Sequence, residues 1–171
     1  MVKAFTHKEK QGKSINISLC EKSNKVCYTV VEKQILGGDS MTNADRLLEK
    51  MTEKRIESLF LNNSTNIRYI TGYSGENIYL LIANSGKWLI TDRKNQESIQ
   101  NIQKEFQIIN FDSDKTTIGA CVNDLLDRHQ ITLMGFERNH INYGLIQDME
   151  LELEYADVIP TVNLVESIVA L

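Results

Sequence analysis

The residues with the side chains best suited to binding a ligand or a partner lie at positions 66–75. Their sequence is Asn-Ile-Arg-Tyr-Ile-Thr-Gly-Tyr-Ser-Gly. This segment follows Ser58–Leu61, a short apolar run typical of a buried strand, and α/β folds place functional loops after such strands. Arg68 offers a planar fork of donors that fits a carboxylate. Asn66 has the side chain of a helix cap, so we expect it to cap a short helix.

The other residues of this segment would support that short helix. Ile67 and Ile70 are spaced so that both can be buried beneath it. Gly72 and Gly75 permit backbone angles that other residues avoid. A tight capped turn that serves only the fold explains the same pattern, so the residues alone leave both interpretations open.

The rest of the sequence contains no recognised motif for nucleophilic catalysis, phosphate binding or zinc binding. No histidine has a second ligand at a spacing typical of a metal site, and the cysteines lack the spacing of a redox or zinc motif. We expect structural roles for all of them: His7, His129 at a helix C-terminus, His140 in a loop, and Cys20, Cys27 and Cys121 as reduced thiols. The sequence therefore predicts no catalytic centre, metal site or cofactor in this chain.

The composition is that of one acidic globular domain. The chain has 171 residues, of which 42% are hydrophobic, and its formal net charge is −4 with a pI of about 5.4. A sizeable core is expected, and the basic field that nucleic-acid binding needs is absent. The apolar runs are too short to cross a bilayer, and the polar residues 1–13 do not resemble a signal peptide. We therefore expect a cytoplasmic protein without nucleic-acid or membrane partners.

A break at residues 37–40, Gly-Gly-Asp-Ser, divides the chain into two parts. Residues 1–40 are an N-terminal extension in which residues 14–20 and 26–31 alternate in the manner of a β-hairpin. An isolated hairpin is marginal in water, so it would pack on the main domain or on another chain. Alternatively, the domain proper begins at Met41 and the preceding residues are only an appendage.

The main part of the chain alternates between helical and strand patterns. Helices are expected at residues 41–55, 94–105, 116–128, 143–153 and 162–171, and strands at 58–61, 78–83, 87–91, 107–111, 132–136 and 158–159. Thr42 and Asp45 resemble a capping box, and Asn84-Ser85-Gly86 is a hairpin turn. The hairpin would pair antiparallel and the later strands parallel. The predicted fold class is α/β, with three layers in which helices flank both faces of a mixed central sheet.

A series of motifs resembles the N-terminal, non-catalytic domain of the creatinase, prolidase and aminopeptidase P family. Residues 66–73 are similar to its Asn-x-Arg-Tyr-hydrophobic-Thr-Gly-aromatic motif, and residues 89–92, Leu-Ile-Thr-Asp, to the end of its hairpin. Residues 134–137, Met-Gly-Phe-Glu, are similar to its Ile-Gly-hydrophobic-Glu segment. The resemblance covers residues 41–171. The matching residues are Asn66, Arg68, Tyr69, Gly72, Asp92 and Glu137.

This resemblance implies an accessory domain ahead of a metallopeptidase domain of the pita-bread type. In the family, that second domain holds a pair of divalent metals and hydrolyses the bond before proline with a metal-bound hydroxide. We expect the metal pair to belong to that catalytic domain and none of it to this chain. The N-terminal domain usually helps to form a homodimer and shapes the mouth of the active site. The matching residues would then have interface or gating roles.

Two departures from the family pattern leave a second hypothesis open. Lys94 and Asn95 stand where the family commonly has an Arg-Tyr pair, and Glu166 and Val169 stand where its linker has an arginine and a lysine. The first hypothesis is the accessory domain of an Xaa-Pro dipeptidase or aminopeptidase. The alternative is a stand-alone protein-binding or oligomerisation module of the same fold.

Overall fold

The computed structural model describes residues 41–92, Ile99 and residues 105–169, together with four short strands nearer the N-terminus. The chain divides into two compact units, Met1–Ser40 and Met41–Leu171. The first unit contains two antiparallel strand pairs: β1 (Glu9–Lys10) with β2 (Lys13–Ser14), and β3 (Asn16–Leu19) with β4 (Val26–Thr29). The second of these pairs lies within the two runs expected to form a hairpin, whereas the first was not expected.

The second unit is built on a six-stranded mixed sheet with the order β10-β9-β5-β6-β7-β8. The strands are β5 (Ser58–Leu61), β6 (Ile78–Ala83), β7 (Gly86–Asp92), β8 (Gln107–Phe111), β9 (Leu133–Glu137) and β10 (Asp157–Thr161). β6 runs antiparallel to both of its neighbours, while β5 pairs parallel with β9, β9 with β10, and β7 with β8. β5, β7, β8, β9 and β10 therefore all end at the same edge of the sheet.

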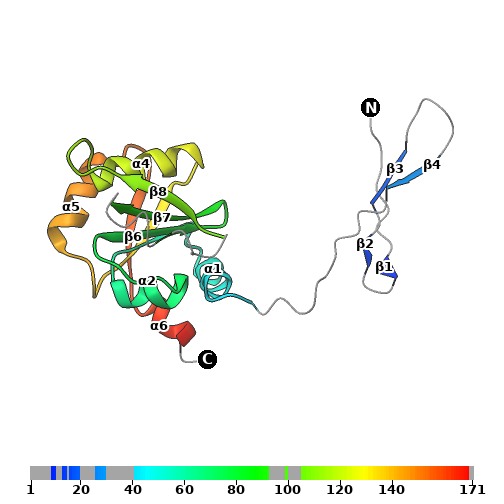
Figure 1. Ribbon diagram of the computed structural model, residues 1–171, viewed down its shortest axis with the longest axis horizontal. Helices are drawn as coiled ribbons and strands as arrows, with labels where there is room; N and C mark the ends of the chain where they lie inside the picture. The colour runs from blue at the N-terminus through cyan, green and yellow to red at the C-terminus, as the bar shows by residue number, and fades with distance from the viewer. Residues whose placement is uncertain are drawn as a thin grey trace. The chain divides into compact units, whose positions relative to one another are not determined.

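Helices cover both faces of this sheet (Figure 1). They are α1 (Asn43–Glu53), α2 (Ser64–Thr71), α4 (Ile118–Arg128), α5 (Tyr143–Glu152) and α6 (Leu164–Val169). α1, α2 and α6 lie on one face, and α4 and α5 on the other. The predicted three-layer α/β fold is confirmed. The helix expected at residues 94–105 lies outside the described residues, apart from the buried Ile99 and the turn residue Glu105.

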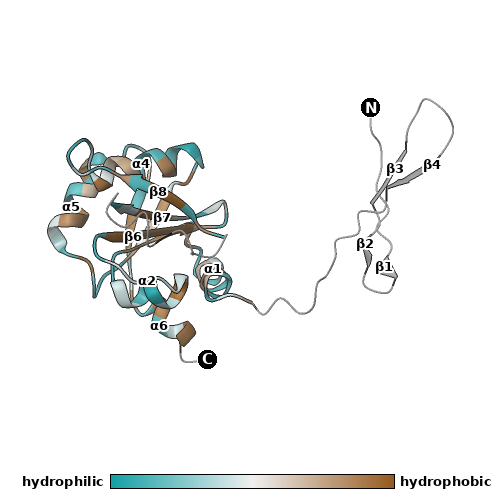
Figure 2. Ribbon diagram, viewed as in Figure 1, coloured by the Kyte–Doolittle hydropathy of each residue, from teal (hydrophilic) through white to brown (hydrophobic). Residues whose placement is uncertain are grey.

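The sheet separates two hydrophobic cores because successive strand side chains point to opposite faces. Leu59, Leu80 and Leu89 face the core shared with α1, α2 and α6. Phe60, Leu81 and Trp88, each the neighbour in sequence of one of those residues, face the core shared with α4 and α5. In Figure 2, β6 is brown along most of its length, while the helices vary between teal and brown. Such strands, buried on both faces, are continuous apolar runs.

Local signals set the ends of several elements. Thr42 and Asp45 form the predicted capping box, with Asp45 N donating to Thr42 Oγ1 at 3.1 Å, so α1 begins two residues later than expected. Ala83 pairs with Gly86, so the hairpin turn between β6 and β7 has two residues, one fewer than expected, because Gly86 already belongs to β7. His129 is the C-cap of α4, and its ring lies 4.5 Å from that of Trp88. Among the described residues, no helix combines the length and apolar character needed to span a membrane.

Candidate functional site

The candidate site lies where three neighbouring parallel strands end. The segments that follow β5, β9 and β10 contribute Asn66, His140 and Glu166, and β9 itself ends in Glu137. Open α/β sheets bind ligands at the carboxyl ends of their strands. The order β10-β9-β5 therefore brings together four polar side chains that are far apart in the sequence.

Asn66 lies inside α2 rather than at its start. The N-cap is Asn63, whose side chain accepts hydrogen bonds from Thr65 N and Asn66 N at 2.9 and 3.2 Å. The expectation that Asn66 caps the helix is therefore wrong, because the helix begins at Ser64 and the position before it is occupied by another asparagine. This shift turns the Asn66 side chain inward, where it is buried.

The buried amide of Asn66 serves two carboxylates at once. Its nitrogen Nδ2 donates to Glu137 Oε1 in a short hydrogen bond and to Glu166 Oε1 at 3.1 Å. Asn66 and Glu137 are thus two motif residues that the fold brings into direct contact. Their contact fastens α2 to the end of β9.

A tight turn after β9 brings His140 back toward the same point. The main-chain carbonyl of Glu137 accepts hydrogen bonds from His140 N at 3.1 Å and Ile141 N at 3.0 Å. His140 Nε2 then lies 3.2 Å from Glu166 Oε1. The ionised carboxylate of Glu166 can only accept, so the hydrogen bond forms when Nε2 of the imidazole carries a proton.

Packing of α6 positions Glu166. The neighbouring residues Leu164, Val165 and Ile168 are buried in the core that α6 shares with α1 and α2. The side chain of Glu166 remains 41% exposed. The cluster therefore extends from the buried Glu137 to a carboxylate and an imidazole at the surface.

The carboxyl groups of Glu137 and Glu166 have different pKa values because their surroundings differ. Desolvation raises the pKa of Glu137 to about 6, and the charge of Glu166 acts in the same direction, against the opposing effects of the Asn66 hydrogen bond and His140. Desolvation acts on Glu166 as well, but hydrogen bonds from Asn66, its own backbone amide and His140 outweigh it and lower the pKa of Glu166. The pair can thus hold a proton on Glu137 while Glu166 carries a charge.

The other residues predicted from the motifs lie apart from this cluster. Arg68 is exposed on α2. Tyr69 is half-buried, and its hydroxyl donates to Ile168 O at 3.4 Å. Gly72 is the C-cap of α2 with φ of 75°, so this glycine does use a backbone angle that other residues avoid. Asp92 ends β7, which is separated from β9 by β5 and β6.

Sequence reasoning missed His140 and Glu166 as members of the site. A usable signal was the spacing Glu137-x-x-His140 directly after a strand, because a tight turn at that point brings the two side chains together. Glu166 had a weaker signal, since it is acidic within the otherwise largely apolar run of α6. Its approach to Glu137 depends on β9 pairing with β10, which no local pattern reveals.

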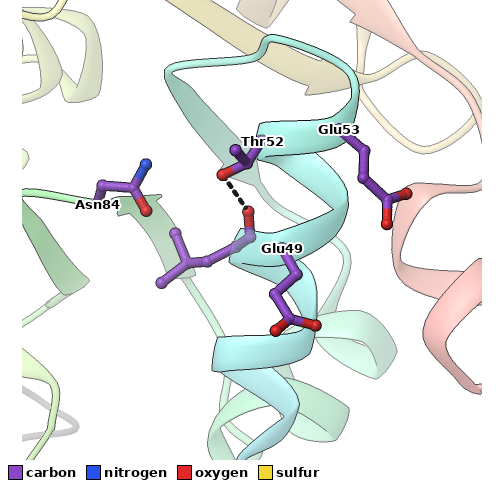
Figure 3. Close-up of a pocket in the computed structure, with 5 residues that line it drawn as sticks. Glu49, Thr52, Glu53 and Asn84 are labelled. Atoms are coloured by element: carbon purple, nitrogen blue, oxygen red, sulfur yellow. Dashed lines mark hydrogen bonds between the residues drawn. The ribbon is translucent and has the colours of Figure 1, made fainter.

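A hollow elsewhere on this domain is a weaker candidate. It has a volume of about 550 Å³ and is lined by Leu48, Glu49, Thr52, Glu53 and Asn84. Figure 3 shows Thr52 and Asn84 on either side of the hollow, while the carboxylates of Glu49 and Glu53 point away from Asn84. Thr52 donates to the carbonyl of Leu48 in its own helix, and Glu53 pairs with Lys50, so these groups satisfy one another locally.

The proteins with related sequences and structures include peptidases and N-terminal domains of peptidases. An uncharacterised peptidase of Bacillus subtilis, YqhT, is 26% identical over 113 residues, which cover 66% of this chain and 31% of that protein. An Xaa-Pro aminopeptidase structure from Streptococcus pyogenes is 28% identical with a TM-score of 0.67, over 74% of this chain and 94% of that one. The chain thus spans about a third of the curated relative it matches.

Two further structures share the fold. The Xaa-Pro dipeptidase from Bacillus anthracis has a TM-score of 0.67 at 24% identity, over 73% of this chain and 34% of that one. The N-terminal domain of the cytoplasmic peptidase PepQ from Mycobacterium tuberculosis has a TM-score of 0.67 at 17% identity, over 75% of this chain and 99% of that one. The Creatinase/Prolidase N-terminal domain family matches residues 44–168. That match covers most of the chain and, together with the three-layer fold, shows that the chain belongs to the creatinase/prolidase N-terminal domain family.

Proposed function

We propose that this chain acts as the accessory N-terminal domain of a proline-specific metallopeptidase, where it contributes to a homodimer and to the mouth of the active site. The observation that carries the proposal is the family match over residues 44–168. Similar domains are parts of longer peptidases: the PepQ structure is the N-terminal domain of a peptidase, and the similar region of the Bacillus anthracis dipeptidase is about a third of its chain.

The motif residues divide into two groups that fit this role differently. Asn66 and Glu137 are buried and fasten α2 to the sheet, so they act through the fold. Arg68 is exposed on the same helix, which makes it the residue of this motif that can reach a carboxylate on another domain or subunit. Gly72 ends α2, so the exposed side of the helix that carries Arg68 stops at this residue.

The chemistry of such a peptidase would come from outside this domain. A dinuclear centre of the family type needs five protein ligands, and the described residues offer one group of three: Glu137, His140 and Glu166. That group does not fit a metal pair. We therefore assign no hydrolytic step to residues of this chain.

A domain exchange tests the accessory role. In the chimera, all 171 residues of this chain replace the N-terminal domain of the Bacillus anthracis Xaa-Pro dipeptidase, which has the same fold. We expect the chimera to sediment as a dimer and to hydrolyse Xaa-Pro dipeptides, while this chain alone is inactive. A folded chimera that is monomeric and inactive contradicts the proposal.

A substitution within the chimera tests the gating residue. Arg68→Ala should raise KM or weaken the dimer without changing the far-ultraviolet circular dichroism. Arg128→Ala is the matched control, because Arg128 is also exposed and pairs with Asp124 of its own helix α4, on the opposite face of the sheet. Equal kinetics and dimer affinity in both variants would remove Arg68 from the proposal.

One observation favours the alternative of a stand-alone binding module. Glu166 has a carboxylate at the position where the linker of the family has an arginine. Its side chain contacts Asn66 and His140 of this domain rather than pointing toward another domain. Reading the gene beyond the codon for Leu171 separates the two hypotheses. A pita-bread sequence there supports the accessory role, and a stop codon supports the module.

A further inference from the structure

We propose that Glu137, His140 and Glu166 bind one divalent transition-metal cation, with Zn²⁺ as the best-fitting ion. One ligand atom from each side chain lies within 4.8 Å of the other two. Two carboxylate oxygens and one imidazole nitrogen form a donor set that proteins use for Zn²⁺. This site is separate from the metal pair of a peptidase domain and does not depend on the proposed function.

The buried oxygen of Glu137 points to a missing partner. The Glu137 side chain is 4% exposed, and its Oε1 accepts from Asn66. The other oxygen, Oε2, is closed to water and has no hydrogen-bond partner among the described residues. Buried polar atoms are nearly always satisfied, so an unsatisfied carboxylate oxygen beside two further ligands indicates a site for a cation.

The charge balance of the cluster leads to the same conclusion. Within the described part of the chain, neither carboxylate forms an ion pair with a lysine or arginine, and the Asn66 amide is a neutral donor shared by both. His140 approaches Glu166 but carries a positive charge only when it is protonated. A divalent ion would neutralise both carboxylates and use the neutral form of the imidazole.

The surface side of the cluster can adjust to a metal. Zn²⁺ ligands lie at about 2.0–2.2 Å from the ion, so the three ligand atoms must move closer together than they are here. Glu137 is fixed by burial, whereas the side chains of His140 and Glu166 are 36% and 41% exposed and can rotate toward it. Three protein ligands leave a fourth position for water on the exposed side.

Binding at this point would connect three parts of the fold. Glu137 ends strand β9, His140 lies in the turn after it, and Glu166 belongs to α6. The ion would hold α6 against the carboxyl end of the sheet. The imidazole favours Zn²⁺ over Mg²⁺ and Ca²⁺, which prefer oxygen ligands alone.

The test uses the full 171-residue chain after dialysis against a chelator. Zn²⁺ is titrated in competition with a chromophoric chelator, and Co²⁺ is added separately to record its ligand-field absorption. We expect one Zn²⁺ per chain, a Co²⁺ spectrum of low coordination number, and no displacement by excess Mg²⁺. Zn²⁺ should also raise the Tm, because a ligand that binds only the folded state stabilises it.

Single substitutions locate the site. His140→Ala and Glu166→Gln each remove one exposed ligand and should weaken Zn²⁺ binding by at least about tenfold, with loss of the Co²⁺ absorption. Glu150→Gln is the matched control, since Glu150 is an exposed glutamate on helix α5. Circular dichroism checks that each variant is folded.

Two results overturn this proposal. One is the absence of Zn²⁺ binding and of any Tm shift in the wild-type chain. The other is binding that persists unchanged in both His140→Ala and Glu166→Gln, which would place the ion at other residues. Neither result bears on the accessory role. That role is tested by the domain exchange and by Arg68→Ala, which do not involve Glu137, His140 or Glu166.

Discussion

Glu137 and Glu166 share a single hydrogen-bond donor, the side-chain nitrogen of Asn66. Glu137 comes from the end of β9 and Glu166 from α6, while the donor comes from α2. One buried amide therefore joins three elements across the carboxyl edge of the sheet. The stability of this arrangement depends on Asn66 more than on either acid, because each acid would otherwise lose its neutral donor.

Replacing Asn66 with alanine should destabilise the domain by about 1–3 kcal/mol, because a buried carboxylate then loses its hydrogen bond. Asn66→Asp should cost more at pH 7, since it adds a third carboxylate. Urea unfolding at constant ionic strength measures both changes. Asn110→Ala on edge strand β8 is the control, because Asn110 is exposed. A free energy of unfolding for Asn66→Ala equal to that of the control would contradict this account.

The metal-free domain should lose stability as the pH rises from about 4.5 to 6. The folded-state pKa of Glu137 is raised from 4.5 to about 6, so its contribution is fully present below pH 4.5 and is lost as the pH rises through the folded value. A shift of this size corresponds to about 2 kcal/mol. Urea titrations with chelator present, compared between wild type and Glu137→Gln, isolate this effect.

The difference in unfolding free energy between those two proteins should change only within that pH window and stay constant on either side of it. Glu166 and Asp45 have lowered pKa values, Glu166 through the hydrogen bonds described above and Asp45 through its hydrogen bond from Lys87. Their contributions are therefore present above the ordinary values of 4.5 and 3.8 and are lost as the pH falls below them. A constant difference between wild type and Glu137→Gln from pH 4 to 7 would show that Glu137 does not titrate as described.

Lys87→Met should destabilise the domain more than Lys50→Met. Lys87 Nζ lies 2.9 Å from Asp45 Oδ1 and 3.0 Å from Glu105 Oε2, and its side chain is only 14% exposed. Its loss leaves two partly buried carboxylates unpaired, for an expected cost of about 1–3 kcal/mol. Lys50 pairs with the exposed Glu53, and such surface pairs contribute about 0–1 kcal/mol. Thermal unfolding of both variants side by side provides the comparison, and equal losses would refute the ranking.

Gly72 should tolerate asparagine better than alanine. Its φ of 75° lies in the left-handed region, and a Cβ atom placed there would meet no other atom within 4 Å. The cost of Gly72→Ala is thus backbone strain alone, about 1–2 kcal/mol, and asparagine adopts this conformation more readily. Gly135→Ala tests a steric clash instead of backbone strain, because the added Cβ would lie 2.9 Å from Thr161 Cγ2. Chemical unfolding should show a smaller loss for Gly72→Asn than for Gly72→Ala, and the reverse order would rule out strain as the cause.

Much of the fold could be predicted because its signals are local. The apolar runs at Ser58–Leu61, Ile78–Ala83 and Gln107–Phe111 are bounded by turn residues and match the observed strands residue for residue. The helix expected at residues 162–171 begins two residues later in the structure, at Leu164, and is described as far as Val169. The pattern of apolar residues therefore predicts where the strands and helices lie. The ends of the helices depend on local hydrogen bonds that this pattern does not show.

The candidate site was only partly predictable because its contacts are not local. The motif identified Asn66 and Glu137 as notable residues, but their hydrogen bond exists because β5 pairs with β9. The cap was assigned to Asn66 because an asparagine before an apolar pair is a normal helix start, and Asn63 satisfied the same rule three residues earlier. His140 and Glu166 joined the cluster through a turn and a strand pairing that periodicity does not encode.

The packing of α6 against α1 has a consequence for the synthesis of this protein. These are the first and last described helices of the domain, and both contribute to the same hydrophobic core. During translation, the part of the apolar surface of α1 that α6 covers therefore stays exposed until residues 164–168 have left the ribosome. Contacts so distant in sequence also slow folding, because a long loop must close before they form. The nascent domain should consequently depend on chaperones until α6 has emerged, and cotranslational proteolysis should cut it more readily before that point than after it.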